Sequence, residues 1–227
     1  MKQYNGEKAI ISLTSWKKRI NTVSKTLFSL FKQCKDFHVV LVLSEDEFPK
    51  KEQELPEILQ TFLENNLFEL LWVKPNLKAF KKILFTMDKY RNVPIISADD
   101  DCMYKYNYAE ELYQHWLKNK NNVVSYRNDN YSGIGCTWGC ATLYPPYYFK
   151  DKGLKYLSSK IVEVGLDDNY YVILRKRMGI RGTTYVNKSI ESAVIFRNEI
   201  EPLHNTYRRN AAHNKAYGII DKLINIA

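Results

Sequence analysis

The stretch VPIISADDD, residues 93–101, decides the fold expected for this chain. Its first six residues are mostly apolar and rich in β-branched side chains, which predicts a buried strand over 93–98. Asp99, Asp100 and Asp101 follow this strand directly. In an open parallel sheet, ligands bind beyond the carboxyl ends of the strands. The three acids therefore mark a candidate functional site.

Strands and helices alternate around this stretch. Apolar runs predict further strands over residues 8–14, 37–44, 68–73 and 123–126. Apolar residues at helical spacing predict helices over residues 22–33, 53–65, 79–90 and 108–118, from Asp167 to just before Gly179, and from about Asn214. Residues 127–149, rich in Gly, Asn and Tyr, are expected to be irregular. The alternation predicts an α/β fold with a mainly parallel central sheet flanked by helices.

Composition and size point to a folded protein with one continuous domain over residues 1–227. Of the 227 residues, 45% are hydrophobic and 26% charged, which excludes a disordered chain. No apolar run approaches the ~18–20 residues of a membrane span, and residues 1–8 are polar, so we expect a cytoplasmic protein.

The four cysteines do not form the dense disulfide framework of small secreted domains, so reduced thiols are expected. Cys136 and Cys140 have a CxxxC spacing, but no second pair at zinc spacing accompanies them. Buried or inert thiols are the expectation for both.

The formal net charge of +9 predicts attraction to an anionic partner. Nucleic acid, an acidic membrane surface and a phosphorylated small molecule all fit, and solubility alone is the alternative. The lysines are spread over many segments, which argues against a dedicated nucleic-acid arm.

The acidic triplet itself favours a divalent cation. Three adjacent carboxylates repel one another, and a bound cation compensates their charge. Hard oxygen ligands favour Mg²⁺ or Mn²⁺. The alternative is a solvated turn in which Asp99 caps the next segment, but the position at a strand end favours the metal site.

Residues 95–104, IISADDDCMY, resemble the DxD region of GT-A-type glycosyltransferases, such as family 2-like bacterial enzymes that build capsule or lipopolysaccharide. The segments that follow the order of such enzymes are 12–20 (SLTSWKKRI), 77–82 (LKAFKK), 139–146 (GCATLYPP) and 166–170 (LDDNY). The resemblance extends to about residue 215. It implies a single GT-A-like domain, with a nucleotide-binding half over 1–101 and an acceptor-binding half over 102–227.

This resemblance implies transfer of a sugar from a nucleotide-sugar donor, with UDP as the commonest nucleotide, to a saccharide or lipid-linked acceptor. Mn²⁺ or Mg²⁺ would bridge the carboxylates and the donor diphosphate. The chemistry agrees, because a metal and nearby cations stabilise the departing nucleoside diphosphate. Asp101 is expected to bind the metal directly, and Asp99 to hold the ribose or a metal-bound water. Asp100 is an alternative ligand.

The loop after the first strand would lie beside the nucleotide if the family pattern holds. Thr14 and Ser15 offer hydroxyl groups, and Arg19 offers a charged donor. A solvated loop is the alternative. Lys78 is expected to approach the phosphates, whereas the lysines at 81–82 are expected to form a solvated helix face.

A second acidic pair, Asp167 and Asp168, opens a predicted helix. Inverting sugar transfer needs a base that takes the proton from the acceptor hydroxyl. By resemblance to the late acidic pair of GT-A enzymes, Asp168 is expected to be this base, with Asp167 beside it. The alternatives are that both acids cap the helix, or that they orient the acceptor in a retaining enzyme.

Four further residues are assigned to the site. Trp138 and Gly139 lie in a glycine-rich stretch where an indole could pack on a sugar, and Tyr144 precedes two prolines that could shape the donor-sugar pocket. A core tryptophan and a rigid strand exit are the alternatives. His204 is a candidate further metal ligand by resemblance, against a surface histidine.

Two other classes of function remain open. A metal-dependent phosphodiesterase or nuclease could use Asp99, Asp101 and Asp168. A basic nucleic-acid-binding module is disfavoured, because carboxylates at its centre would repel phosphates, and no nucleic-acid partner is expected. The lysines also predict peripheral attachment to the inner face of an anionic membrane.

Overall fold

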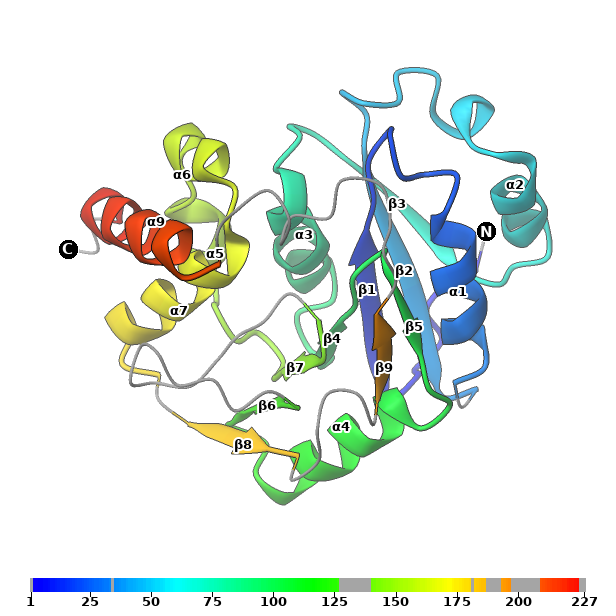
Figure 1. Ribbon diagram of the computed structural model, residues 1–227. Helices are drawn as coiled ribbons and strands as arrows, with labels where there is room; N and C mark the ends of the chain where they lie inside the picture. Colours follow the sequence, from blue (N-terminus) through cyan, green and yellow to red (C-terminus); the bar gives the residue numbers. More distant parts are fainter. Residues whose placement is uncertain are drawn as a thin grey trace.

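The structure, a computed structural model, describes residues 2–33, 35–126, 140–180, 182–186, 193–196 and 209–224. In this part of the chain, a seven-stranded sheet has the order β3-β2-β1-β4-β7-β6-β8. Its strands are β1 (Ala9–Thr14), β2 (Phe37–Ser44), β3 (Glu69–Val73), β4 (Ile95–Ser97), β6 (Val123–Ser125), β7 (Thr142–Tyr144) and β8 (Thr183–Tyr185). Figure 1 shows β1 and β4 near the middle of the molecule.

Parallel pairing dominates this sheet. β3, β2, β1 and β4 run parallel, with Ser12 of β1 opposite Ser97 of β4. β7 is antiparallel to both of its neighbours, and β8 is parallel to β6. The α/β class with a mainly parallel sheet is confirmed. The three acids follow β4, the middle strand of the sheet, at its carboxyl end.

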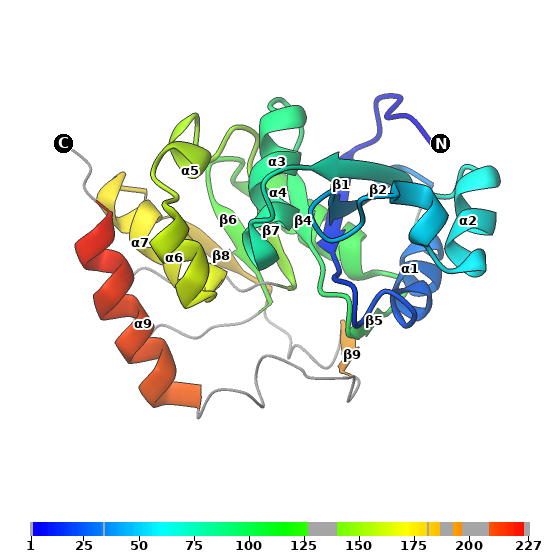
Figure 2. The same ribbon diagram turned by 90° about the horizontal axis from the view of Figure 1, so that it is seen from above.

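Helices cover both faces of the sheet (Figures 1 and 2). They are α1 (Val23–Phe31), α2 (Glu57–Glu64), α3 (Lys81–Lys89), α4 (Tyr108–Lys118), α5 (Lys152–Lys155), α6 (Ser159–Val164), α7 (Asp167–Arg177) and α9 (Arg209–Leu223), with 3₁₀ turns η1 (Lys51–Glu54) and η2 (Lys78–Phe80). No helix in the described ranges has the length and apolar character to cross a bilayer.

Alternation along β2 explains the two layers. Leu41 and Leu43 belong to one buried cluster, with apolar residues of α1, α2 and α4. Val40 and Val42 belong to the other, with residues of α3, α6, α7 and α9. Because successive side chains of a strand point to opposite faces, a continuous apolar run is what a sheet covered on both sides requires.

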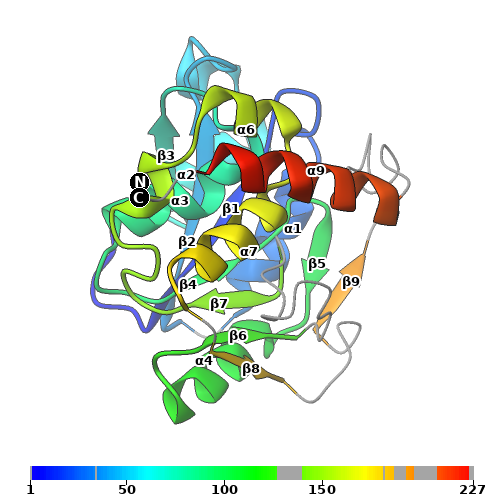
Figure 3. The ribbon, with the colours of Figure 1, turned by 90° about the vertical axis from the view of Figure 1, so that its left-hand side faces the viewer.

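A separate two-stranded antiparallel ribbon follows the three acids. β5 (Cys102–Tyr104) begins directly after Asp101 and pairs antiparallel with β9 (Val194–Phe196). Figure 3 shows the two strands side by side, apart from the main sheet. The chain after the acids is thereby tied to a segment from near the end of the sequence.

Two boundaries expected from the sequence are wrong. The stretch 127–149 is not irregular throughout, because β7 lies within it and pairs with the central strand β4. The last helix begins at Arg209 and not near Asn214.

A buried charged cluster at the start of β3 gives a test of the fold. The Glu69 carboxylate accepts hydrogen bonds from Lys89 Nζ at 2.6 Å and from the Tyr90 hydroxyl at 2.5 Å, and lies 2.8 Å from His38 Nε2. Burial alone would raise the pKa of Glu69, but these hydrogen bonds lower it to about 2. The cluster therefore stabilises the fold only while Glu69 is ionised.

We expect Glu69→Gln to reduce the free energy of unfolding at pH 7 by on the order of 2 kcal/mol. The folded pKa lies below the unfolded value of 4.5, so this contribution is present above pH 4.5 and disappears as the pH falls toward 2. Urea unfolding of both proteins from pH 7 to pH 3 measures the difference. A gap that stays constant over this range would contradict the assigned role of the Glu69 charge.

Candidate active site

The acids after β4 lie in a turn that neighbouring elements hold through the backbone. The Thr26 hydroxyl of α1 donates to the carbonyl of Asp100 at 2.9 Å, and the amide of Asp99 donates to the Tyr104 hydroxyl at 2.7 Å. Tyr104 belongs to β5, and its own amide donates to the Ser29 hydroxyl of α1. The positions of the three carboxylates therefore depend on α1 and on the ribbon.

Asp100 points inward, to the loop that follows β1. Its Oδ2 accepts a 2.6 Å hydrogen bond from the Ser15 hydroxyl, and its Oδ1 lies 3.0 Å from the Arg19 guanidinium. Burial raises the pKa of Asp100 to about 6, against the lowering effects of Arg19 and Ser15. Asp100 thus joins the loop to the acidic turn.

Arg19 also binds the third acid. Its second terminal nitrogen lies 3.1 Å from Asp101 Oδ2, so one guanidinium spans Asp100 and Asp101. Burial and then the neighbouring Asp99 raise the pKa of Asp101, while Arg19 opposes them. Ser15 and Arg19 thus contact carboxylates of the acidic turn directly, and their expected place beside a nucleotide stays a prediction.

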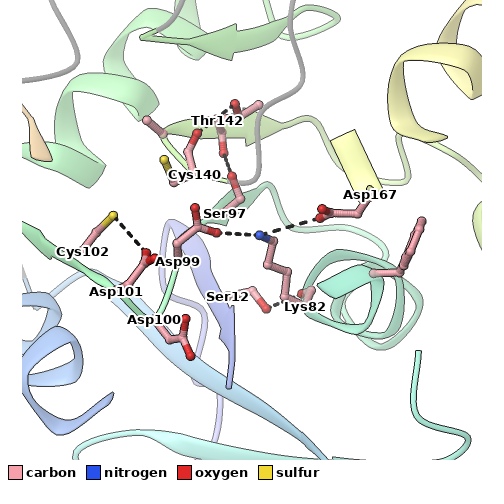
Figure 4. Close-up of polar contacts among 12 residues, drawn as sticks. Ser12, Lys82, Ser97, Asp99, Asp100, Asp101, Cys102, Cys140, Thr142 and Asp167 are labelled. Carbon is pink, nitrogen blue, oxygen red and sulfur yellow. Dashed lines mark hydrogen bonds and ion pairs between the residues drawn. The ribbon is translucent and has the colours of Figure 1, made fainter. Parts of the chain in front are cut away.

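Lys82 joins the two acidic groups of the chain (Figure 4). Its Nζ lies 2.7 Å from Asp99 Oδ1 and 3.7 Å from Asp167 Oδ2. Burial alone would lower the pKa of Lys82, but Asp99, Asp167 and Asp168 raise it well above its usual value. A permanent ammonium group therefore stands between the acids after β4 and the start of α7.

The prediction that the lysines at 81–82 form a solvated helix face is wrong. Lys81 and Lys82 are buried, with 2% and 4% of their surface exposed, and do not form a solvated face. Lys81 instead contacts Glu47 Oε2 at 3.6 Å and Asn76 Oδ1 at 3.4 Å. Lys78 is exposed and lies in the turn η2, so its proposed contact with phosphates stays a prediction.

A sharp turn aims the second acidic pair at the site. α6 ends at Val164, the next residue Gly165 has a left-handed φ of 79° that favours glycine, and α7 begins at Asp167. Asp167 is buried and Asp168 is half-buried. Burial raises the pKa of Asp167, while Lys82 opposes this. The N-cap position is Leu166 and both acids lie in the first turn of α7, where backbone hydrogen bonds from residues 167 and 168 reach the Asp167 carboxylate. The helix-capping alternative therefore stays open for Asp167.

Thr14 and Tyr144 occupy positions in the sheet. The Thr14 hydroxyl donates to the carbonyl of Val42 at 2.7 Å, a contact within the sheet, and its expected place beside a nucleotide stays a prediction. Tyr144 is fully buried in β7, and its hydroxyl has no hydrogen-bond partner among the described residues. Trp138, Gly139 and His204 lie outside the described residues.

Two of the three carboxylates after β4 are exposed enough for a divalent cation to reach them. The side chains of Asp99 and Asp101 are 33% and 17% exposed, whereas that of Asp100 is 4% exposed. Both oxygens of Asp100 already contact Ser15 or Arg19. Asp99 and Asp101 would therefore hold the ion, and Asp100 would hold Arg19, which also contacts Asp101.

Lys82 is the site residue that sequence reasoning missed. One signal could have found it: Lys81 and Lys82 occupy the first turn of α3, where the helix dipole disfavours cations and where no acidic residue is present. Lysines at such a position need nearby anions to compensate them. Here the anions come from the ends of β4 and the start of α7.

Comparison with solved structures shows the same fold. S. aureus TarS 1-349 in complex with UDP-GlcNAc matches with a TM-score of 0.61 and 12% identity, over 95% of this chain and 66% of that chain. The same fragment in complex with UDP gives 0.58 and 12%, over 96% and 69%. This chain spans 60% to 69% of the length of the TarS 1-349 chains and 37% of the longer TarS chain.

A structure of GalNAc-T7 with UDP, GalNAc and Mn²⁺ matches with a TM-score of 0.42 and 15% identity, over 54% of this chain and 23% of that chain. No protein-family model matches the sequence, and no curated protein does. The likeness to TarS is therefore one of fold: an α/β GT-A-like sheet flanked by helices.

Proposed function

We propose that this protein is a metal-dependent glycosyltransferase that uses a nucleotide-sugar donor, with UDP as the nucleotide. One observation supports this most strongly: Lys82 lies within 2.7 Å of Asp99 and 3.7 Å of Asp167. The acids suited to a donor diphosphate and the acids suited to an acceptor hydroxyl therefore meet at one point. The fold shared with TarS, whose structures hold UDP and UDP-GlcNAc, is consistent with this proposal.

The residues of the chain divide into a donor side and an acceptor side. On the donor side, within residues 1–101, Asp99 and Asp101 would hold Mn²⁺ or Mg²⁺, which would stabilise the charge of the departing diphosphate. Arg19 fixes the orientation of Asp101 through its 3.1 Å contact. Lys82 supplies a fixed positive charge where negative charge develops, without reorganisation during the reaction.

The acceptor side, within residues 102–227, would supply the base. Asp168 is half-buried at the start of α7, whereas Asp167 is buried against Lys82. A proton acceptor must reach the acceptor hydroxyl, so the more exposed Asp168 is the base in our proposal, and transfer proceeds with inversion. Asp167 would hold Lys82 in place. The acceptor in this proposal is a saccharide or a lipid-linked saccharide.

The direct test is donor binding by calorimetry, with a panel of nucleoside diphosphates and nucleotide sugars in Mn²⁺. We expect a UDP compound to bind with Mn²⁺ and to lose affinity in EDTA. Slow metal-dependent hydrolysis of one nucleotide sugar would then identify the donor sugar. Binding by none of the panel, together with cleavage of a phosphodiester substrate, would replace the transferase with the metal-dependent phosphodiesterase.

Asp101→Ala should abolish metal-dependent UDP binding and leave the fold intact. The carboxylate belongs to a repelling group of three acids, and Arg19 retains Asp100 as a partner when Asp101 is removed. We expect a change of less than about 1 kcal/mol in the unfolding free energy. Calorimetry and thermal unfolding measure the two effects, with Asp151→Ala, an exposed acid, as control. Parental UDP affinity in Asp101→Ala would remove this residue from the metal site.

Attachment to an anionic membrane surface is part of the same proposal. The net charge of +9 and the lipid-linked class of acceptor support it. Flotation with vesicles of neutral and of anionic lipid is the measurement. Equal recovery with both kinds of vesicle would contradict it.

A further inference from the structure

Two buried cysteines lie beside the acidic turn. Cys102 is the first residue of β5 and follows Asp101 directly, and Cys140 lies two residues before β7. Cys102 is fully buried, and Cys140 is 4% exposed. Both are free thiols. The proposed transfer reaction uses neither of them.

The two thiols and one carboxylate converge. The Sγ atoms of Cys102 and Cys140 and a carboxylate oxygen of Asp99 all lie within 4.8 Å of one another. Figure 4 shows the three side chains pointing toward a common space, while Asp99 Oδ1 contacts Lys82 on the other side. Side-chain hydrogen bonds already link Cys140 to Cys102 and to Asp99, and Cys102 Sγ makes a further 3.6 Å contact to Asp101 Oδ1.

This spacing is close to that of a tetrahedral metal site. With metal–sulfur bonds of about 2.3 Å and metal–oxygen bonds of about 2.0 Å, ligand atoms lie about 3.5 to 3.8 Å apart. From separations of up to 4.8 Å, side-chain rotations that move the three ligand atoms about 1 Å closer together would give such distances. The set supplies three protein ligands and leaves a fourth position for water or a ligand.

The chemistry of the donors selects the ion. Thiolates bind Zn²⁺ and Cd²⁺ in preference to Mg²⁺ and Mn²⁺, which favour oxygen ligands. We propose that Asp99, Cys102 and Cys140 form a binding site for a thiophilic divalent cation of the Zn²⁺ class. This site shares Asp99 with the carboxylate pair Asp99 and Asp101. Its other two ligands are the thiols of Cys102 and Cys140.

Because Asp99 belongs to both sites, we expect the thiophilic ion to inhibit the proposed sugar transfer; this expectation rests on the proposed function. An ion held by the two thiols would engage Asp99 and compete with the metal and donor there. Zn²⁺ should then inhibit donor turnover in the presence of excess Mn²⁺. Cys102→Ala/Cys140→Ala should be resistant to this inhibition.

Cadmium titration tests the site without any donor. The full chain is reduced with a phosphine, freed of metal, and titrated with Cd²⁺ while the ultraviolet thiolate-to-cadmium charge-transfer band is recorded. We expect saturation of this band at one equivalent. Asp99→Asn should weaken Cd²⁺ affinity by at least about 10-fold, since even outer partners of metal ligands contribute that much. Asp101→Asn, which changes a neighbouring acid outside the set of three, should keep the band.

The double variant Cys102→Ala/Cys140→Ala should lose the band. Circular dichroism checks its fold, and the single variants Cys102→Ser and Cys140→Ser, each expected to weaken binding, serve if the double variant does not fold. No band in the reduced parent, or an unchanged band in folded cysteine variants, would overturn the site. Because the band is read without nucleotide, its presence or absence is independent of whether the protein transfers sugars.

Discussion

Lys82→Met should lower the unfolding free energy at pH 7 by about 3 kcal/mol, the range found when one partner of a buried ion pair is removed. Methionine fills a similar volume but leaves Asp99 and Asp167 facing each other without the ammonium that now separates them. The loss should shrink in acid. Lys82 is the main charge that lowers the pKa of Asp99 and that opposes the raised pKa of Asp167, so both pKa values rise without it and the loss in stability becomes smaller as these acids take up protons.

The matched control for Lys82→Met is Lys78→Met. Both residues precede β4 within the same short segment, but Lys78 is exposed and Lys82 is buried. Lys78→Met should change stability by less than about 0.5 kcal/mol, as is usual for surface positions. Denaturant unfolding at pH 7 and pH 5 measures both variants. Equal effects of the two substitutions would mean that the bridge between the acids contributes nothing.

Asp168→Asn should reduce kcat for sugar transfer by about 10²–10⁴-fold while the Kd of the donor stays within about 2-fold. The amide preserves size and much of the hydrogen bonding but accepts no proton. Under the alternative role, a charge at the start of α7, the loss is one favourable interaction with the helix dipole, about 0.3–1 kcal/mol of stability and no kcat. Turnover and donor affinity on the same preparation therefore separate the two roles.

Asp167→Asn is the companion variant. Asp167 is buried with its Oδ2 3.7 Å from Lys82, so its loss should act on stability and on the position of Lys82. We expect a drop in unfolding free energy larger than that of Asp168→Asn. A loss of kcat in Asp167→Asn, with full kcat in Asp168→Asn, would move the base to Asp167.

Much of the fold could be predicted, because long apolar runs leave few alternatives. The strand expected over 37–44 is found at Phe37–Ser44, and the helix over 108–118 at Tyr108–Lys118. Four of the three-residue strands, β5, β7, β8 and β9, were not predicted, whereas β4 and β6, which are equally short, were. A strand that short carries little alternation of its own, and the four that were missed depend on partners that are distant in the sequence.

The residues of the candidate site also differ in how far the sequence could predict them. The acids and the loop at 14–19 follow the ends of strands, so their neighbourhood in the fold could be expected, whereas Lys82 was placed on a solvated face. Lysine is almost never fully buried unless it is paired. Its partners Asp99 and Asp167 are brought to it only by the packing of α3 and α7 against the sheet, which local patterns do not contain.

Synthesis of the chain places the parts of this site in a definite order in time. The strands β1 to β4 are complete once residue 97 has emerged, but the turn of acids leads into β5, whose partner β9 follows roughly 90 residues later. At the ~5–20 residues per second of translation, that interval is about 5 to 20 s. During it, the nascent protein has the residues of its central sheet, while Tyr104, which holds the backbone of Asp99, lies in an unpaired edge strand. The acidic turn is therefore completed late, and a ribosome stalled before residue 194 would carry a chain whose acids are held by α1 but whose ribbon lacks its second strand.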